Sequence, residues 1–202
     1  PIILYDADID TSGITGNTFS NPDAWISLEN STLNGNKTFT WVNGLSYRLR
    51  GSITIASGVT LTLASGVELQ TNSQQIYVDG RFESSGGILH HPYTYSELQV
   101  RGGGTLSLSN CTVRGYGLIN IQQEAQADFS GVTFEYYNGG SWYTGSPRLF
   151  YNNGSQGTVT NSSGDPTLNI YTSNLTVQNN SFAKVGLYAG APTITGNSFS
   201  DQ

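Results

Sequence analysis

Apolar and polar residues alternate along most of this chain, and the alternation resumes after short breaks at Gly, Ser or Asn. It is clearest in "GSITIASGVTLTLASGVELQ" at 51–70. A period of two predicts short β-strands that bury one face, with the breaks as corners, because glycine tolerates a positive φ. No stretch shows sustained helical periodicity with caps, so an all-β fold is predicted. The inward-facing residues of this segment are expected to be Ile53, Ile55, Val59, Leu61, Leu63, Val67 and Leu69.

The strand-and-corner pattern recurs along the chain as an internal repeat. "LTVQNNSF" at 175–182 aligns without a gap with "PTITGNSF" at 192–199, an offset of 17 residues, and "ITGNTFS" at 14–20 is a further copy. Residues 106–113 and 127–134 align more loosely, at an offset of 21. Periods of roughly 20 residues indicate a solenoid whose turns stack on one another.

The repeat also decides between two all-β folds. Short strands with Gly-rich corners suit a β-sandwich built from hairpins, but the gap-free alignment favours a single-stranded right-handed parallel β-helix of about nine coils. Asn17, Asn180 and Asn197 would occupy equivalent corners, where stacked amides can hydrogen-bond to one another. We expect one domain over residues 1–202, in which residues 21–50 form an N-terminal cap or a less regular coil.

The same segments resemble pectate-lyase-like right-handed β-helices of bacterial secreted and cell-surface proteins. Residues 51–70 are similar to the early coils of that family, and "LTVQNNSF…PTITGNSF" is similar to its later coils. The resemblance covers about residues 45–202. It implies the fold and an extracellular or cell-surface location, and it is not specific to one activity.

Composition narrows the expected partners. Only 11% of the residues are charged and the formal net charge is −6. A nucleic-acid partner is not expected, because phosphate binding requires clustered Lys and Arg. No apolar run approaches the roughly 18 residues that a membrane span needs. The single cysteine, Cys111, cannot form an internal disulfide and is expected to be a small buried side chain.

The two ends of the chain favour a piece of a longer polypeptide. It starts at Pro1, contains no methionine and ends within a copy of its own repeat. Neighbouring domains of a parent chain are therefore expected partners.

An aromatic-rich loop insertion at 134–157 interrupts the repeat and is the predicted ligand site. Its rings are candidates for stacking on sugars, because rigid aromatic side chains combine an apolar face with a hydrogen-bonding edge. A second polar and aromatic stretch at 90–99 would lie beside the first if the coil lengths permit. The alternative is that the loop folds over the helix and buries its own rings. The candidate ligand-binding residues are Tyr136, Tyr137, Trp142, Tyr143, Tyr151, Tyr93 and Tyr95.

Signals for catalysis are weaker, and no catalytic residue is assigned. Lyases of the resembled superfamily typically need an acidic calcium-binding cluster with an Arg or Lys base, and its hydrolases carry paired aspartates and a Gly-His-Gly element. The chain has neither an Asp-Asp pair nor Gly-His-Gly, and Arg101 and Arg114 are not expected to face the same side. His90 and His91 would point to opposite faces of a strand, although the following Pro92 favours an exposed loop pair.

One acidic cluster is a candidate metal site. "DADID" places Asp6, Asp8 and Asp10 on one strand face, where three like charges need a cation or a basic partner. Calcium prefers such oxygen ligands. Thr11 and Asn17 depart from the EF-hand pattern, and the alternative is a solvated acidic terminus. The sequence requires no cofactor, and calcium is the one candidate.

We therefore expect an extracellular polysaccharide-binding or adhesion module that acts through exposed aromatic residues on a rigid β-helix. One alternative is a polysaccharide lyase or glycoside hydrolase of the pectate-lyase-like superfamily. The other is a structural stalk without a ligand. Burial of Trp142 and Tyr143 would favour the stalk, whereas a groove with Arg101 or Arg114 beside two carboxylates would favour the enzyme.

Overall fold

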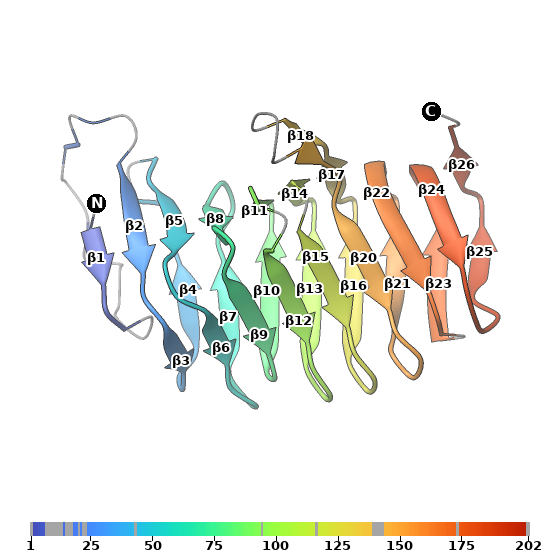
Figure 1. Ribbon diagram of the computed structural model, residues 1–202, viewed down its shortest axis with the longest axis horizontal. Helices are drawn as coiled ribbons and strands as arrows, with labels where there is room; N and C mark the ends of the chain where they lie inside the picture. Colours follow the sequence, from blue (N-terminus) through green and yellow to red (C-terminus); the bar gives the residue numbers. More distant parts are fainter. Residues whose placement is uncertain are drawn as a thin grey trace.

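The chain winds into a parallel β-solenoid of about eight turns (Figure 1). Strands of successive turns pair in parallel, which confirms the predicted all-β helical architecture. The computed structural model describes residues 2–6, 14, 18–19, 21, 24–42, 44–93, 95–115, 117–138, 144–172 and 174–200.

Three sheets form the sides of the solenoid. Each full turn adds a stretch of β-strand to every one of the three sheets. The first sheet contains β1 (Ile2–Leu4), β2 (Trp25–Leu28), β5 (Ser46–Leu49), β8 (Glu68–Gln70), β11 (Ile88–His91), β14 (Thr112–Gly115), β17 (Thr133–Glu135) and β26 (Ser198–Phe199). The second contains β3 (Ser31–Leu33), β6 (Ile53–Ile55), β9 (Gln75–Val78), β12 (Glu97–Val100), β15 (Leu118–Ile121) and β20 (Arg148–Tyr151). The third contains β4 (Lys37–Phe39), β7 (Thr60–Leu63), β10 (Arg81–Ser85), β13 (Thr105–Ser109), β16 (Gln126–Ser130), β21 (Gln156–Thr160), β23 (Asn174–Gln178) and β25 (Thr193–Thr195).

Two long strands, β22 (Ser163–Ile170) and β24 (Ser181–Leu187), run through both the first and the second sheet. Their pairing shifts register between Gly164 and Thr167, where the chain passes from one sheet to the next. Because of these strands, the first two sheets are hydrogen-bonded as one 16-stranded sheet, beside the 8-stranded third sheet.

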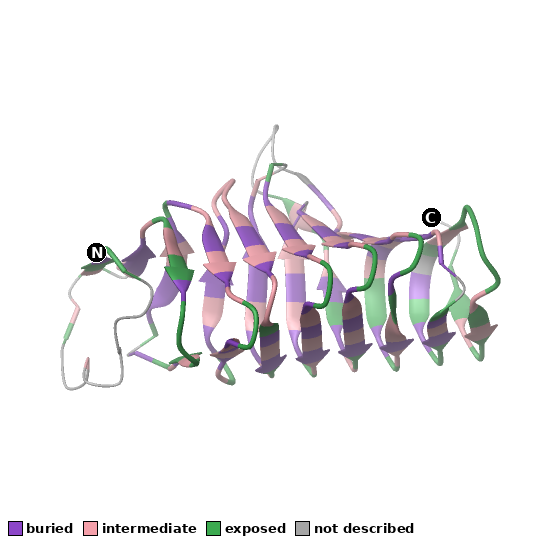
Figure 2. Ribbon diagram, turned by 90° about the horizontal axis from the view of Figure 1, so that it is seen from below, coloured by how far each residue is buried: buried purple, intermediate pink, exposed green. Residues whose placement is uncertain are grey.

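The core consists of inward-facing residues that stack in register from turn to turn. Every predicted inward residue of segment 51–70 is at most 8% exposed, and Cys111 is also buried. Val177 pairs with Ile194 and Phe182 with Phe199, so the alignment of the last repeats is confirmed. Figure 2 shows buried and less buried residues alternating along the strands, as period-two patterning requires.

The predicted asparagine corner is confirmed at Asn180 and Asn197. The Asn180 amide donates to Asn197 Oδ1 (2.9 Å) and to the Val159 carbonyl (2.7 Å), and its Oδ1 accepts from the Ser162 backbone N–H. Asn197 repeats the pattern one turn later by donating to the Val177 carbonyl. Asn17 lies outside the described residues.

Gly157 shows how closely the turns approach. It occupies an inward position of β21, between Ala127 and Leu175 of the neighbouring strands. A Cβ at this position would lie 1.9 Å from the Ala127 carbonyl oxygen. A larger residue would therefore force the turns apart.

The chain forms about eight turns rather than the predicted nine, and one turn is longer than the others. Phe134 pairs with Gly164, 30 residues later, because an antiparallel hairpin of β18 (Tyr137–Asn138) and β19 (Thr144–Gly145) is inserted between β17 and β20. The excursion predicted at 134–157 thus occurs between β17 and β20, and the rest of that range forms β20 and the start of β21. Residues 25–49 contain β2 to β5, which join all three sheets. No helix among the described residues has the length and hydropathy of a membrane span.

Candidate functional site

Outward-facing side chains of the second sheet form regular columns. Six strands carry these columns: β9, β12, β15, β20, β22 and β24. The residue at the middle outward position of each strand is in register with the corresponding residue of the next turn. We call this outer surface the second-sheet face. Its middle column consists of Tyr77, Gln99, Asn120, Phe150, Asn169 and Gly186.

Three aromatic rings stack at the C-terminal half of this face. The Phe150 and Tyr171 rings have centroids 6.4 Å apart at an interplanar angle of 18°, and those of Tyr171 and Tyr188 are 4.8 Å apart at 13°. Tyr188 is 61% exposed, so its ring is covered by Tyr171 on one side only. The stack offers ring edges, hydroxyl groups and one open ring face to a ligand.

Side-chain amides occupy the middle of the second-sheet face and bond along the solenoid axis. Asn152 donates to Asn120 Oδ1 (2.6 Å), and Asn120 donates to Glu97 Oε1 (3.0 Å). Gln122 donates to Gln99 Oε1 (3.3 Å). Each bond joins consecutive turns, which orients the amides and leaves their remaining donors and acceptors for other partners.

The N-terminal end of the face carries an ion pair. Arg101 Nε lies 2.6 Å from Asp79 Oδ1, and its Nη2 contacts the second carboxylate oxygen. The Arg101 guanidinium also lies 4.5 Å from the centre of the Tyr77 ring. These contacts engage Arg101 on two sides.

A second polar cluster lies on the outer face of the first sheet. His90 Nδ1 lies 2.8 Å from Glu68 Oε1, and Arg114 Nε lies 2.7 Å from Glu135 Oε2. The Tyr137 ring of the hairpin packs edge-on against His90, with centroids 4.7 Å apart. His90 is 7% exposed, and its Nε2 has no hydrogen-bond partner among the described residues. The hydrogen bond from His90, with further contributions from Gln70 and Arg114, lowers the pKa of Glu68 despite its partial burial.

The two histidines face opposite sides of β11, as a strand requires. The expectation of an exposed loop pair is wrong, because His91 is fully buried in the solenoid interior. Its Nδ1 lies 3.1 Å from Thr71 Oγ1, and a Cβ on Gly117 would overlap its ring. Burial, with His90 beside it, lowers the pKa of His91 to about 3.

The predicted aromatic residues separate into exposed and covered ones. Tyr95 and Tyr136 are 79% and 56% exposed, whereas Tyr93 and Tyr137 are half-buried. Both excursions leave the solenoid between the first and second sheets, and Tyr137 of the hairpin contacts His90 of β11, at the start of the 90–99 stretch.

Tyr151 requires a correction. Its side chain is fully buried, and its hydroxyl donates to the Ala127 carbonyl at 2.7 Å. Burial, with Asp128 nearby, raises its pKa well above the ordinary value. A buried ring cannot stack on a sugar, so Tyr151 belongs to the core. The remaining two candidates, Trp142 and Tyr143, lie outside the described residues.

Two of the three candidate metal residues lie outside the described part of the chain. Asp6 is described, but Asp8 and Asp10 lie outside the described residues. Across the part of the chain that is described, no group of three or more His, Cys, Asp or Glu side chains could hold a metal ion.

The two arginines weighed for catalysis lie on different faces, as expected. Arg101 follows β12 of the second sheet, and Arg114 lies in β14 of the first. Arg114 has Glu135 in contact and acts electrostatically on Glu68. The strands of these two carboxylates are separated by β11 and β14, which places their backbones about 14 Å apart. Paired-carboxylate hydrolysis needs the two groups roughly 5–10 Å apart.

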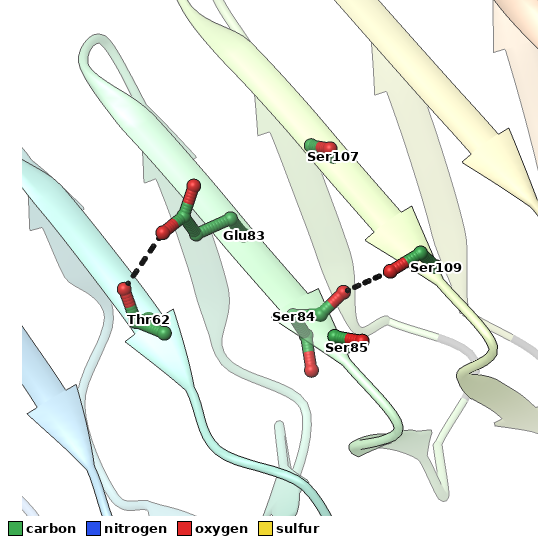
Figure 3. Close-up of a pocket in the computed structure, with 6 residues that line it drawn as sticks. All are labelled: Thr62, Glu83, Ser84, Ser85, Ser107 and Ser109. Carbon is green, nitrogen blue, oxygen red and sulfur yellow. Dashed lines mark hydrogen bonds between the residues drawn. The ribbon is translucent and has the colours of Figure 1, made fainter.

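A hollow of about 180 Å³ opens on the third sheet (Figure 3). It lies over outward positions of β7, β10 and β13, and its lining residues are Thr62, Glu83, Ser84, Ser85, Ser107 and Ser109. Both carboxylate oxygens of Glu83 at its rim are engaged, Oε1 by Thr62 and Oε2 by Arg81. Its lining residues have polar side chains, and the charge of Glu83 is paired with Arg81.

The sequence prediction missed the aromatic stack of the second-sheet face. A signal was present, because Tyr171 and Tyr188 are 17 residues apart, the same offset as the last two repeats. Both residues lie just before the aligned segments, so the alignment ended too early to include them. Phe150 follows a longer turn and could not be placed by a constant offset.

Comparison of the chain with models of protein families, with curated proteins and with solved structures found no match.

Proposed function

We propose that this chain is an extracellular polysaccharide-binding or adhesion module with a pectate-lyase-like β-helix, and that it binds glycans through the second-sheet face. One observation carries the proposal: amide side chains and stacked aromatic rings occupy aligned positions on consecutive turns. Sugars present both apolar ring faces and hydroxyl groups, and aromatic rings beside amides match both.

Rigidity supports the same proposal. The columns are placed by backbone pairing between turns, and the amides are oriented by bonds such as that from Asn152 to Asn120. A surface that is already ordered loses little conformational entropy when a ligand binds. The exposed rings of Tyr95 and Tyr136 leave the solenoid at the corner where this face begins, and they add contact area at its margin.

The first experiment is a pull-down against insoluble and immobilised polysaccharides, with calcium and with chelator, and mass spectrometry of the supernatant. We expect depletion of the protein without released oligosaccharides. Tyr188→Ala should weaken binding about threefold to tenfold, the equivalent of ~0.5–1.5 kcal/mol of aromatic contact. Tyr5→Ala is the matched control, because Tyr5 is also exposed but follows β1 of the first sheet.

Failure of every polysaccharide to deplete the protein would leave the structural stalk as the better explanation. Equal loss of binding in Tyr188→Ala and Tyr5→Ala would remove the second-sheet face from the proposal. Calcium dependence would direct attention to Asp6, Asp8 and Asp10.

A polysaccharide-cleaving enzyme is the second candidate function, and the first-sheet cluster favours it. Glu68 bonded to His90 Nδ1 resembles an orienting carboxylate and a base, and Arg114 lies beside Glu135. In the same assay this candidate predicts released oligosaccharides that disappear in His90→Gln. Products that persist in His90→Gln would exclude the cluster as the source of the activity.

A further inference from the structure

The spacing of the second-sheet face suits a linear polymer. Strands β9, β12, β15, β20, β22 and β24 follow one another without a gap in the hydrogen-bonded order or register. Neighbouring strands are ~4.8 Å apart, so six strands span about 24 Å. One unit of an extended pyranose chain has nearly the length of one strand spacing. A chain along the axis would therefore meet equivalent positions at each sugar.

The chemistry of the columns suits an uncharged ligand. None of the six described residues in the middle column carries a charge. The next outward column lies two residues further along each strand. Its two charged members, Asp79 and Arg101, are paired with each other. Its other four members are uncharged: Gln122, Asn152, Tyr171 and Tyr188. The outward column on the other side carries one anion, Glu97, and two cations, Arg148 and Lys184, on its six strands. A carboxylate or sulfate on each sugar would therefore not find a cation at each turn and would lose hydration.

Asn169 supplies a side-chain amide within this face, next to the aromatic stack. The residue is only 5% exposed, but its amide is not among the buried polar groups that lack a hydrogen-bond partner in the described structure. It lies beside Gly186, where a Cβ would come within 3.3 Å of Asn169 Oδ1 and 2.8 Å of the Tyr188 ring. Gly186 therefore keeps the amide and the ring side by side. An amide donates and accepts hydrogen bonds, so Asn169 beside the Tyr188 ring matches a sugar hydroxyl beside an apolar sugar face.

From these observations, and resting on the proposed function, we infer that the ligand is a linear, uncharged polysaccharide in an extended conformation, of the β-(1→4)-linked pyranose type. It lies along the solenoid axis with one sugar unit per turn, between Tyr77 and Tyr188. The alternative geometry is a single terminal sugar stacked on the open face of Tyr188.

Calorimetric titration with a length series tests the inference. The probes are cello-oligosaccharides and xylo-oligosaccharides from disaccharide to octasaccharide, with oligogalacturonates of matched length as charged probes. We expect the affinity to rise with each added unit, to level off at about the hexasaccharide, and to be lower for the charged series. Equal affinity for disaccharide and hexasaccharide, or a preference for oligogalacturonates, would overturn the inference.

A variant far from the aromatic stack separates the two geometries. Gln99 lies on β12, four strands before β24 in the stack, and within the described structure its side chain accepts one hydrogen bond, from Gln122. We expect Gln99→Ala to weaken hexasaccharide binding several-fold, with trisaccharide binding unchanged. Ser107→Ala, an outward substitution on the third sheet, is the matched control, and thermal melting verifies that both variants fold. Unchanged hexasaccharide binding in Gln99→Ala would establish the end-on geometry instead.

The outcomes distinguish the two proposals. Depletion by an insoluble polysaccharide without length dependence in solution would contradict the axial geometry and leave the binding function standing. Absence of binding to every polymer and every oligosaccharide would contradict both.

Discussion

At the scale of single residues, two adjacent histidines acquire opposite roles. His90 faces outward, bonds to Glu68 and lies under the Tyr137 ring. His91 points into the core, where its only polar contact among the described residues is with Thr71, and its Nε2 is unpaired there. A neutral imidazole is tolerated in that setting, and a charged one is strongly disfavoured.

We predict that His91 makes the protein acid-sensitive. Its pKa is lowered from 6.5 to about 3. Between these values the unfolded chain binds a proton that the folded protein excludes, so the free energy of unfolding falls as pH falls, by up to ~1.4 kcal/mol per pH unit. Urea denaturation at a series of pH values measures this slope.

His91→Gln should flatten that slope while it retains a polar group near Thr71. The pH range between 6.5 and 4.5 is the informative part of the titration. The pKa of Glu68 is lower than the ordinary glutamate value of 4.5, so Glu68 begins to lose its own stabilising effect only below that pH. An unchanged slope in His91→Gln would contradict the assignment.

At the scale of elements, the corners between strands hold successive turns in register. The asparagine corner between the third and first sheets is the clearest case, since Asn180 satisfies backbone groups of two other residues, Val159 and Ser162. The β18–β19 hairpin acts differently, because it leaves the solenoid and covers His90 from outside. Hydrogen-bonded corners such as that of Asn180 stabilise the stack of turns, whereas inserted hairpins such as β18–β19 change the surface of the solenoid.

We predict that Asn180→Ala is strongly destabilising. The substitution leaves the Ser162 N–H and the Val159 carbonyl without their partner in a buried corner. Each unpaired buried group costs about 1–3 kcal/mol, so a loss of ~2–6 kcal/mol is expected in chemical denaturation. Asn197→Ala is the matched control and should cost less, because Asn197 is more exposed. Equal losses would show that burial does not decide the cost.

At the scale of the whole molecule, each turn contacts mainly its two neighbours. Leu106 and Ile119 in the central turns are fully buried, whereas Leu187 and Phe199 near the C-terminal end are 59% and 50% exposed. Figure 2 shows this increase in exposure along the solenoid. Stability in such a stack is close to a sum over turns and their interfaces, so the turns need not unfold together.

Hydrogen exchange should therefore depend on position along the axis. We predict the slowest amide exchange in central strands such as β13 and β15 and faster exchange in β25 and β26, measured by mass spectrometry of peptic peptides. Uniform protection from β13 to β26 would indicate a single cooperative unit and would contradict the prediction.

Much of the fold could be predicted from local patterns. Alternation identified the inward residues of segment 51–70, and the 17-residue repeat offset correctly paired Val177 with Ile194. The candidate site was predicted less well. Tyr151 is aromatic within an irregular segment, yet it is the last residue of β20 and faces the core. Composition cannot show on which side of a strand a residue falls when the preceding loop has an unknown length.

The sequence by itself determined that this protein is an all-β solenoid of stacked turns, because alternation and Gly or Asn corners act over a few neighbouring residues. Only the tertiary structure decided which outward side chains meet. Tyr171 stacks on Tyr188 and Glu68 bonds to His90 because insertions of differing length still return each strand to the same register. Contacts of this kind depend on the length of every intervening turn, and no local pattern encodes that sum.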